Sequence, residues 1–291
     1  MIFIPAYAKL NLALSVVGRL PDGRHELRSV VVRLDWHDLV GAEVVRVEVA
    51  EEAPEIGVTV SGPAAVEVPV EDNLVLRAAR AARAAVSARP AGAVRLCLEK
   101  RLPAAAGLGG GSADAAAVLR LLGGDRISAW DPGMLRLADT LGSDVPACLA
   151  GGSLLVGGAG ERLEPILHPP LDLTVAVAGR SGTAATFAAL TPDEWRGPGR
   201  PEALAGLLAR GRPVAPELLG SDLEAAACRA HPELAAGLHR LRDALPATAW
   251  YLTGSGGAVF ALAAGRGEAE AVAARARDLG FTARACRTVA A

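Results

Sequence analysis

A glycine-rich loop at residues 103–114, with the sequence PAAAGLGGGSAD, constrains the fold of this chain more than any other feature. Alternating apolar residues at 94–98 predict a strand before the loop, and residues 115–122 predict a helix after it. A helix N-terminus offers unpaired N–H groups to an anion, so the loop predicts an anion site, most often one for phosphate. A structural turn that holds two elements close together is the alternative. The glycines expected to take positive φ and to admit the ligand are Gly107, Gly109, Gly110 and Gly111.

The loop also narrows the kind of phosphate ligand. It is not a Walker A loop, because no Gly-Lys-Ser or Gly-Lys-Thr closes it. It contains Gly107-x-Gly109-x-x-Ser112, a weak relative of the dinucleotide fingerprint, which requires an acidic residue about 20 positions later at a strand end. The nearest acids, Asp125 and Asp131, lie in a segment rich in glycine, tryptophan and proline. A dinucleotide-dependent oxidoreductase is therefore the alternative from another class of enzyme.

Strand and helix patterns are intermixed along the chain, which predicts an α/β or α+β fold. Asp72 or Asn73 is expected to cap a helix whose arginines face outward. A glycine-rich stretch at 151–160 marks a domain boundary, giving domains at residues 1–155 and 156–291. Strands are expected within 3–17, 30–49, 58–70, 94–98, 171–178, 248–252, 258–263 and 282–287, and helices at 74–88, 115–122, 135–141, 202–210, 223–230, 232–245 and 268–279.

The composition excludes several classes of protein. Hydrophobic residues make up 51% and charged residues 21%, so the chain is not disordered. Thirty basic and thirty-two acidic side chains give a net charge of -2, which argues against a nucleic-acid partner. The uncharged stretch 244–265 is long enough to cross a membrane, but its central Thr-Gly-Ser-Gly-Gly predicts a strand, a tight loop and a strand. No secretory signal and no clustered cysteines are evident, so we expect a cytoplasmic protein without a membrane partner and leave its oligomeric state open.

Two lysines stand out in a chain that otherwise uses arginine. Lys9 and Lys100 are the only lysines among thirty basic residues, and Asn11 and Asn73 are the only asparagines. A compact ammonium group provides a point charge that a planar guanidinium does not replace, so both lysines are candidates for function. Chance survival at two surface positions is the alternative.

These rare residues belong to motifs that resemble those of the GHMP kinases, which include galactokinase, homoserine kinase and mevalonate kinase. Three segments follow the order of the family's three motifs: Ala8-Lys9-Leu10-Asn11-Leu12, the loop 103–114, and Leu252-Thr253-Gly254-Ser255-Gly256. Other segments resemble the branch of the family that acts on a cytidyl-linked methylerythritol: Asp22-Gly23-x-His25, Glu71-Asp72-Asn73-Leu74, Lys100-Arg101-Leu102-Pro103 and Leu141-Gly142-x-Asp144-Val145-Pro146. The resemblance covers most of the chain.

This resemblance implies a two-domain GHMP-kinase fold, with an N-terminal domain like that of ribosomal protein S5, an α/β C-terminal domain and an active site between them. It implies that ATP donates a phosphoryl group to the 2-hydroxyl of the methylerythritol moiety, in the non-mevalonate isoprenoid pathway. Mg²⁺ is expected with ATP, and no protein ligand is assigned to it. Two alternatives remain: a kinase for another small alcohol, and a catalytically silent binding protein on the same fold.

The resemblance also implies roles for individual residues. Asp144 corresponds to the base that takes the hydroxyl proton, and Lys9 to the group beside it that positions or polarises the same hydroxyl. The other residues expected at the substrate are Asn11, His25 (at the cytosine), Thr183 and Phe187. The residues expected around ATP are Asn73, Leu74 and Lys100 at the adenine, and Pro103, Ala104, Ala105, Ala106, Gly107, Leu108, Gly109, Gly110, Gly111, Ser112 and Ala113 at the phosphates.

Several of these residues have a simpler interpretation. Asp144 precedes Val145-Pro146 and could cap a helix that starts there, and Asn73 is a plausible helix cap. Lys9 could be an edge lysine that blocks aggregation, and His25 follows a turn, where histidines are more often surface residues.

Two positions depart from the pattern of the resembled branch. Arg24 stands where that branch has the aromatic residue of Asp-Gly-Tyr-His, which is thought to stack on the cytosine. A guanidinium plane also stacks on bases, so we expect Arg24 to be tolerated there. Pairing with the substrate diphosphate and a solvent-facing position are the alternatives. The segment 179–183 matches only loosely, which weakens the assignment of Thr183.

Overall fold

The structure is a computed structural model of residues 1–291, and it describes all of them except 46–55, 66–72, 86–92, 124–127 and 291. The chain forms two compact units. Unit 1 comprises Met1–Ala8, Trp36–Ala104 and Gly109–Ala150, and unit 2 comprises Lys9–Asp35, Ala105–Leu108 and Gly151–Ala291. Two long strands, β1 (Ile2–Arg19) and β2 (His25–Val45), contribute residues to both units. The division into residues 1–155 and 156–291 stays a prediction.

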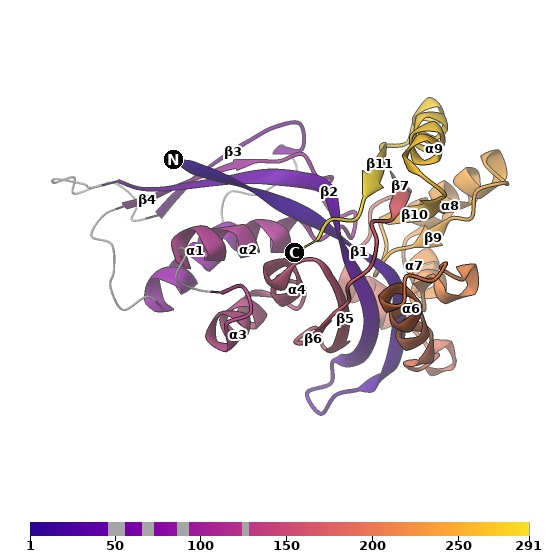
Figure 1. The fold of residues 1–291 in the computed structure, drawn as a ribbon, viewed down its shortest axis with the longest axis horizontal. Helices are drawn as coiled ribbons and strands as arrows, with labels where there is room; N and C mark the ends of the chain where they lie inside the picture. The colour runs from indigo at the N-terminus through magenta and orange to yellow at the C-terminus, as the bar shows by residue number, and fades with distance from the viewer. Residues whose placement is uncertain (46–55, 66–72, 86–92, 124–127, 291) are drawn as a thin grey trace. The chain divides into compact units, whose positions relative to one another are not determined.

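Unit 1 packs helices against strands of a mixed sheet. Strand β3 (Ile56–Ser61) runs parallel to β4 (Ala93–Glu99), which runs antiparallel to the C-terminal part of β2. In Figure 1, helices α1 (Leu74–Ala85) and α2 (Gly110–Gly123) lie along one face of these strands. Helices α3 (Pro132–Leu141) and α4 (Val145–Ala150) pack against α2. Buried core residues include Val40, Val75, Leu96, Leu98, Ala116, Leu119 and Leu149.

Helix α1 begins where the sequence predicts. The Oδ1 atom of Asn73 accepts a hydrogen bond from the backbone N–H of Val75 (3.1 Å), so the expectation of an asparagine cap is confirmed. The helix is confirmed over 74–85, and the rest of its predicted range lies outside the described residues. The buried face consists of Val75, Ala78, Ala79 and Ala82, and the outward face carries the exposed Arg77 and Arg80.

Helix α2 begins at Gly110, earlier than its predicted start at residue 115. The N–H of Ala113 donates to the carbonyl of Gly109 (2.8 Å), so the glycines are already wound into the first turn. Positive φ occurs at Gly107 (74°) and Gly109 (69°), whereas Gly110 and Gly111 are helical, so the expectation of positive φ at those two was wrong. Glycine has a low helix propensity, so residues 110 and 111 do not look helical in the sequence. Tertiary packing stabilises the helix there.

Unit 2 contains a four-stranded antiparallel sheet. Its strand order is β11 (Ala283–Arg287), β7 (Asp172–Val177), β10 (Ala258–Ala263) and β9 (Tyr251–Leu252). Helices α8 (Pro232–Ala244) and α9 (Arg266–Asp278) pack on this sheet (Figure 1), and their buried alanines and leucines share a core with β7 and β10. Residues 253–257 form the loop between β9 and β10, which confirms the strand, loop and strand expected in 244–265.

The remaining elements of unit 2 are short, and the sequence patterns missed most of them. Strand β5 (Ser153–Gly158) pairs antiparallel with β2 and with β6 (Arg162–Pro165). Strand β8 (Gly220–Ser221) pairs with β1. The helices are α5 (Thr183–Ala189), α6 (Gly199–Ala209) and α7 (Glu224–Ala230), with 3-10 turns at Pro192–Glu194 and Pro216–Leu218. Within the described ranges, no helix has the length and apolar character that a membrane crossing requires.

Candidate functional site

The centre of the candidate site in unit 2 is a buried ammonium group on β1. Lys9 is 8% exposed, and its Nζ donates a hydrogen bond to Oδ1 of Asn11 (3.0 Å). The Nδ2 atom of Asn11 donates to Oγ of Ser29 (2.8 Å), whose hydroxyl donates to the carbonyl of Ala13 (2.7 Å). This chain of donors fixes the amide orientation of Asn11, so that its oxygen faces Lys9. Lys9 is therefore an oriented buried cation, which contradicts the edge-lysine interpretation.

The second glycine loop, residues 253–257, lies against this pair. The Oγ1 atom of Thr253 accepts a hydrogen bond from the backbone N–H of Asn11 (2.8 Å). A Cβ atom added to Gly254 would lie 3.0 Å from Oδ1 of Asn11 and 3.6 Å from Nζ of Lys9. The position thus requires glycine for close approach as well as for its positive φ of 56°. The motifs around Lys9 and Gly254, far apart in sequence, meet at one place.

The part of the phosphate loop that belongs to unit 2 packs against the same glycine loop. The N–H of Lys9 donates to the carbonyl of Leu108 (2.9 Å), and the N–H of Ala258 donates to the carbonyl of Ala106 (2.7 Å). A Cβ atom on Gly107 would lie 2.3 Å from the carbonyl oxygen of Gly256. The two glycine loops are therefore in backbone contact.

An aromatic cluster surrounds His25 in unit 2. The ring of Phe187 on α5 stacks on His25 with centroids 5.0 Å apart and an interplanar angle of 24°. The ring of Trp195 meets His25 edge-on, with centroids 5.8 Å apart. Burial, and then the positive charge of Arg19, lower the pKa of His25 below its ordinary value, so the ring is neutral at neutral pH. Its Nε2 atom is buried without a hydrogen-bond partner among the described residues, so His25 is not a simple surface histidine.

Arg24 pairs with an acidic neighbour in its own turn. Its Nε atom pairs with Oδ2 of Asp22 (2.8 Å), and its side chain is 56% exposed. This arrangement favours the interpretation in which Arg24 does not stack on a base, because the turn itself supplies a partner for the guanidinium. The ring that packs beside His25 is that of Phe187 instead.

Thr183 connects α5 to the second glycine loop. Its hydroxyl lies 3.0 Å from the hydroxyl of Ser255, and the hydroxyl of Thr186 donates to the carbonyl of Ser255 (3.1 Å). Unit 2 thus brings together five of the predicted substrate and catalytic residues around residues 253–257 and α5, namely Lys9, Asn11, His25, Thr183 and Phe187.

Unit 1 holds the other group of predicted residues, with a buried charge cluster at its centre. Lys100 follows β4, and its Nζ contacts Oδ2 of Asp38 on β2 and Oδ2 of Asp114 on α2 (2.7 Å to Asp114). The Oδ1 atom of Asp38 accepts hydrogen bonds from the backbone N–H groups of Arg101 (2.5 Å) and Leu102 (2.8 Å). Asp38 therefore fixes both the lysine and the start of the loop that follows it.

The charges of this cluster shift one another's pKa. Burial raises the pKa of Asp114 to about 7, against the lowering effect of Lys100 and with a further rise from Asp38. Burial alone would lower the pKa of Lys100, but the carboxylates of Asp114 and Asp38 outweigh it and hold that pKa above its ordinary value. Lys100 is thus a permanent cation, whereas Asp114 titrates close to neutral pH.

The predicted base, Asp144, lies immediately before α4. Its carbonyl accepts a hydrogen bond from the N–H of Cys148 (3.1 Å), which places Asp144 at the helix cap position. Its side chain is half-buried, and α4 itself carries no charged residue. The cap interpretation of this position is therefore compatible with the structure, and the catalytic role stays a prediction that mutation can test.

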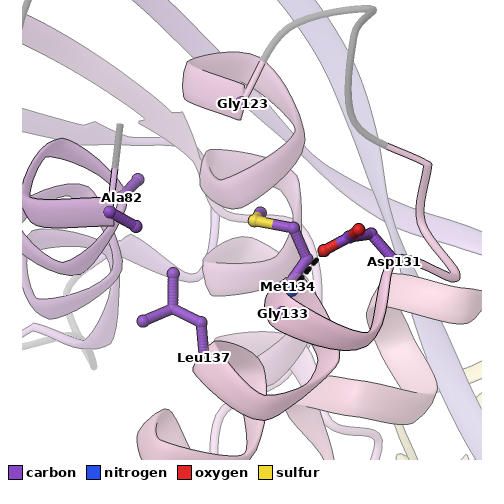
Figure 2. Close-up of a pocket in the computed structure, with 7 residues that line it drawn as sticks. Ala82, Gly123, Asp131, Gly133, Met134 and Leu137 are labelled. Carbon is purple, nitrogen blue, oxygen red and sulfur yellow. Dashed lines mark hydrogen bonds between the residues drawn. The ribbon is translucent and has the colours of Figure 1, made fainter. Parts of the chain in front are cut away.

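A pocket elsewhere in unit 1 is separate from these groups. It measures about 220 Å³ and lies among α1, the end of α2 and the start of α3 (Figure 2). The one ionisable group in its lining, Asp131, caps α3 by accepting a hydrogen bond from the N–H of Met134 (2.9 Å), drawn as the dashed line in Figure 2. Its lining contains none of the predicted site residues, so it offers apolar walls without the groups that phosphoryl transfer requires. The residues that line it are Ala82, Ala85, Gly123, Asp131, Gly133, Met134 and Leu137.

Sequence reasoning missed three polar residues that the structure ties to the site. Asp38 carried no distinguishing signal, because the segment 30–45 also contains the acids Asp35 and Glu43. Asp114 lay inside the motif that drew attention to the loop, but its burial against Lys100 depends on how α2 packs. Ser29 carried no signal, since a serine in a strand is ordinary.

Two family models match the chain: the GHMP kinases N terminal domain over residues 73–152, and the GHMP kinases C terminal domain over residues 203–280. A protein of Rhizorhabdus wittichii named 4-diphosphocytidyl-2-C-methyl-D-erythritol kinase is 42% identical over 265 residues, covering 88% of this chain and 84% of the relative. A protein of Pelotomaculum thermopropionicum with the same name is 39% identical over 279 residues, covering 94% and 92%.

Solved structures agree with these matches. A crystal structure of 4-(cytidine 5'-diphospho)-2C-methyl-D-erythritol kinase has a TM-score of 0.78 and 34% sequence identity over the full length of both chains. A crystal structure of mevalonate kinase has a TM-score of 0.65 at 11% identity, which shows that the fold is shared. The two-domain fold implied by the sequence motifs is therefore confirmed.

Proposed function

This chain belongs to the GHMP kinase family, and we propose that it transfers the γ-phosphoryl group of ATP to the 2-hydroxyl of 4-diphosphocytidyl-2-C-methyl-D-erythritol. The enzyme is an ATP-dependent phosphotransferase, as its relatives of about 40% identity are kinases by name. The observation that supports the chemistry most directly is the buried, oriented ammonium of Lys9, because phosphoryl transfer depends on positioning and on charge stabilisation.

Lys9 and Asp144 are the residues to which we assign the reacting hydroxyl. The ammonium of Lys9, oriented by Asn11, would hold the hydroxyl oxygen and stabilise negative charge that develops on it. The carboxylate of Asp144 would take the proton as the oxygen attacks the γ-phosphorus. The bond between that phosphorus and the bridging oxygen of ADP then breaks, and ADP leaves.

We assign the nucleotide to the loop 103–113 and its flanking residues. The N–H groups of the first turn of α2 would bind phosphate oxygens, and the helix dipole favours that negative charge. Asn73, Leu74 and Lys100 are assigned to the adenine. Asn73 already uses its Oδ1 to cap α1, so its amide orientation is set before a ligand binds.

Gly111→Val is expected to weaken nucleotide binding by about tenfold while leaving the melting temperature close to that of the parent. A Cβ atom at Gly111 has no atom within 4 Å, so the fold has room for it, but a branched side chain would obstruct phosphates at the helix start. Calorimetric titration and thermal melting measure the two effects. Gly107→Ala is the matched contrast, because its Cβ would clash with the Gly256 carbonyl at 2.3 Å and should lower the melting temperature. Unchanged nucleotide affinity of Gly111→Val would show that the loop is only a turn.

We assign the cytosine to the cluster of His25, Phe187 and Trp195. His25 is neutral and its Nε2 atom lacks a partner among the described residues, so a base edge that reaches it would satisfy a buried polar group. An aromatic ring such as Phe187 supplies stacking, which is worth about 1–3 kcal/mol per base. Thr183 would contact the substrate beside this cluster.

Phe187→Ala is expected to raise KM for the cytidyl substrate by about tenfold and to leave KM for ATP unchanged, because stacking is lost at one substrate only. Arg24→Ala is the comparison variant, and both KM values should stay at the parent level, since Asp22 already pairs with the guanidinium. Steady-state kinetics with each substrate varied in turn gives all four values. A raised cytidyl KM in Arg24→Ala with an unchanged one in Phe187→Ala would reverse the assignment.

Mg²⁺ fits this arrangement as a cation carried by the nucleotide. In the described part of the chain, no three acidic, histidine or cysteine side chains gather to hold a metal. Mg²⁺ usually keeps waters and phosphate oxygens with few protein ligands, so an all-protein cage is not needed. Ser112 has the one side-chain oxygen within residues 103–113, and we propose it as the protein ligand. When bound, the metal would neutralise charge on the β- and γ-phosphates.

The dinucleotide alternative has less support. Dinucleotide folds place the glycine loop after a strand of a parallel sheet, whereas β4 lies in a mixed sheet, parallel to β3 and antiparallel to β2. The proposal of a cytoplasmic enzyme is supported by the cysteines, which form no disulfides and so suit a reducing compartment; they are Cys97, Cys148, Cys228 and Cys286.

A coupled assay of ADP release tests the function. We expect rapid release with the cytidyl substrate and background rates with mevalonate and homoserine. Preferential turnover of either of the other alcohols would move the chain to another branch of the family. ATP binding without turnover of any alcohol would support the silent binding protein instead.

A further inference from the structure

Ser221 lies in a buried turn of unit 2 that is anchored to the same strand as Lys9. Strand β8, which ends at Ser221, runs parallel to β1 and pairs Ser221 with Leu14. The N–H of the next residue, Asp222, donates to the carbonyl of Leu14 (3.0 Å). The carboxylate of Asp222 in turn accepts a hydrogen bond from the N–H of Val16 (3.0 Å). Ser221 therefore has a fixed position relative to the strand that carries Lys9.

The partners of Ser221 fix the direction of its hydroxyl proton. The residue is 8% exposed, so water has little access to it. Its Oγ accepts a hydrogen bond from the N–H of Leu223 (3.2 Å) and donates one to the carbonyl of Gly254 (2.7 Å). A backbone N–H only donates and a carbonyl only accepts, so the serine proton belongs to the second bond. The hydroxyl of Ser221 thus holds the carbonyl of Gly254.

This carbonyl needs a partner because the loop sequence does not fix its direction. Gly254 has a φ of 56°, and glycine adopts backbone conformations of either sign without steric cost. A trans peptide is planar, so the carbonyl of Gly254 and the N–H of Ser255 point in opposite directions and turn together. Turning this peptide would bring the carbonyl to the side where the N–H now lies. The hydrogen bond from Ser221 selects one of the two orientations.

The same peptide adjoins the pair formed by Lys9 and Asn11. A Cβ atom added to Gly254 would lie 3.0 Å from Oδ1 of Asn11 and 3.6 Å from Nζ of Lys9. The next carbonyl along the loop, that of Ser255, accepts a hydrogen bond from the hydroxyl of Thr186 (3.1 Å). Gly254 is thus a wall beside the ammonium. Displacing that wall would let the flexible four-carbon stem of the lysine move.

We propose that Ser221 is a positioning residue for phosphoryl transfer, which holds Gly254 against Lys9 and so keeps the ammonium at the reacting hydroxyl. The catalytic consequence rests on the proposed function, whereas the placement of the ammonium by Ser221 is a property of the fold. A misplacement of about 1 Å at a reacting centre costs up to about 10² in rate. Loss of one clamp out of several should cost less than that.

The kinetic test compares Ser221→Ala with Ser153→Ala. Ser153 is the matched control, because it is also in unit 2, is 9% exposed, and bonds through its hydroxyl to the His168 ring (2.8 Å). We expect kcat to fall by about tenfold in Ser221→Ala and to stay at the parent level in Ser153→Ala, with KM for ATP unchanged in both. Ser221→Cys fills the same space with a weak donor and replaces the alanine variant if that one does not fold.

A double-mutant cycle with Lys9→Arg shows whether Ser221 acts through Lys9. Once the ammonium is replaced, the serine hydroxyl has nothing left to position. Ser221→Ala should therefore lower kcat no further in the Lys9→Arg background. Losses that multiply in the double variant would show that the two residues act independently, as expected of a serine that only stabilises the fold.

Lysine NMR measures the placement of the ammonium without any assay of activity. The chain has two lysines, Lys9 and Lys100, so protein labelled with ¹³C-lysine gives two sets of side-chain signals. Lys9→Arg removes one set and thereby assigns it. We expect Ser221→Ala to shift the Cε signal of Lys9 and to leave that of Lys100, in unit 1, in place. Ser153→Ala should shift neither signal.

An unmoved Lys9 signal in Ser221→Ala, or equal shifts of Lys9 and Lys100, would overturn the inference. Multiplying losses in the cycle would also overturn it, as would a kcat in Ser153→Ala as low as that in Ser221→Ala. If the parent transfers no phosphoryl group to the cytidyl substrate, the proposed function fails. The Lys9 signal then still decides whether Ser221 places the ammonium, so the two failures are distinct.

Discussion

Replacing Asp144 with asparagine is expected to lower kcat by about 10² to 10⁴ while leaving the affinity for ATP nearly unchanged. The amide of asparagine does not accept the proton that the attacking hydroxyl must lose. The change is informative because asparagine caps helices as well as aspartate does. The position before α4 therefore keeps its structural role, and only the proposed base is removed. Single-turnover kinetics and nucleotide titration measure the two quantities.

Asp131→Asn is the matched control for this experiment. Asp131 also precedes a helix, α3, and its carboxylate accepts a hydrogen bond from the N–H of Met134. Both variants exchange a carboxylate for an amide at a helix cap, but only Asp144 is assigned to the reacting hydroxyl. If both variants have a kcat close to that of the parent, Asp144 is a helix cap and not the base.

Lys9→Arg is expected to lower kcat by about 10²-fold or more, although it preserves the positive charge. Lys9 is 8% exposed, and its ammonium lies 3.0 Å from Oδ1 of Asn11 with Gly254 beside it. A planar guanidinium is broader and places its donors at different angles, so it would displace the amide or the glycine loop. Steady-state kinetics, with thermal melting to verify the fold, measures the effect.

Arg95→Lys is the control, because it exchanges the same two residue types in reverse at a surface position. Arg95 is on β4, its side chain is 61% exposed, and it pairs with Glu43 (3.2 Å) at the surface. Exposed ion pairs contribute little to stability, so this exchange should leave kcat and the melting temperature unchanged. If Lys9→Arg is as active as Arg95→Lys, then Lys9 supplies charge without geometry, and the assignment to the hydroxyl fails.

The sequence predicted the longer regular elements of this fold well, because alternation and capping are local properties. The strand 258–263 was predicted with the bounds that β10 has, and Asn73 was predicted as a cap. Helix α5 was missed, since its seven residues bury only Thr186 and therefore carry little hydrophobic periodicity. The predicted start of helix α2 was too late, because glycine has a low helix propensity and was not read as part of the helix.

The site was predictable in part for a different reason. Sequence motifs identified Lys9 and the second glycine loop as candidates. Their contact depends on a hydrogen bond between Asn11 and Thr253, which are 242 positions apart, and no local pattern predicts it. The cluster around Lys100 was not predicted, because Asp38 and Asp114 reach it from a strand and a helix whose packing no local pattern specifies. Trp195 was missed for the same reason, since its contact with His25 comes from tertiary structure alone.

Unit 2 is built from three separate stretches of the chain, and this affects how it folds during synthesis on the ribosome. Residues 9–35 and 105–108 belong to a unit that is otherwise built from residues 151–291. The N–H of Val289 donates to the carbonyl of Arg33 (3.0 Å), and Leu34 forms a bridge with Thr288. Unit 2 therefore cannot complete its fold until residues 283–289 have left the ribosome. Until then its first strand, which carries Lys9, lacks these partners. The strand that carries Lys9 is among the first parts synthesised and among the last to gain its partners, so we expect it to be open to premature association during that interval.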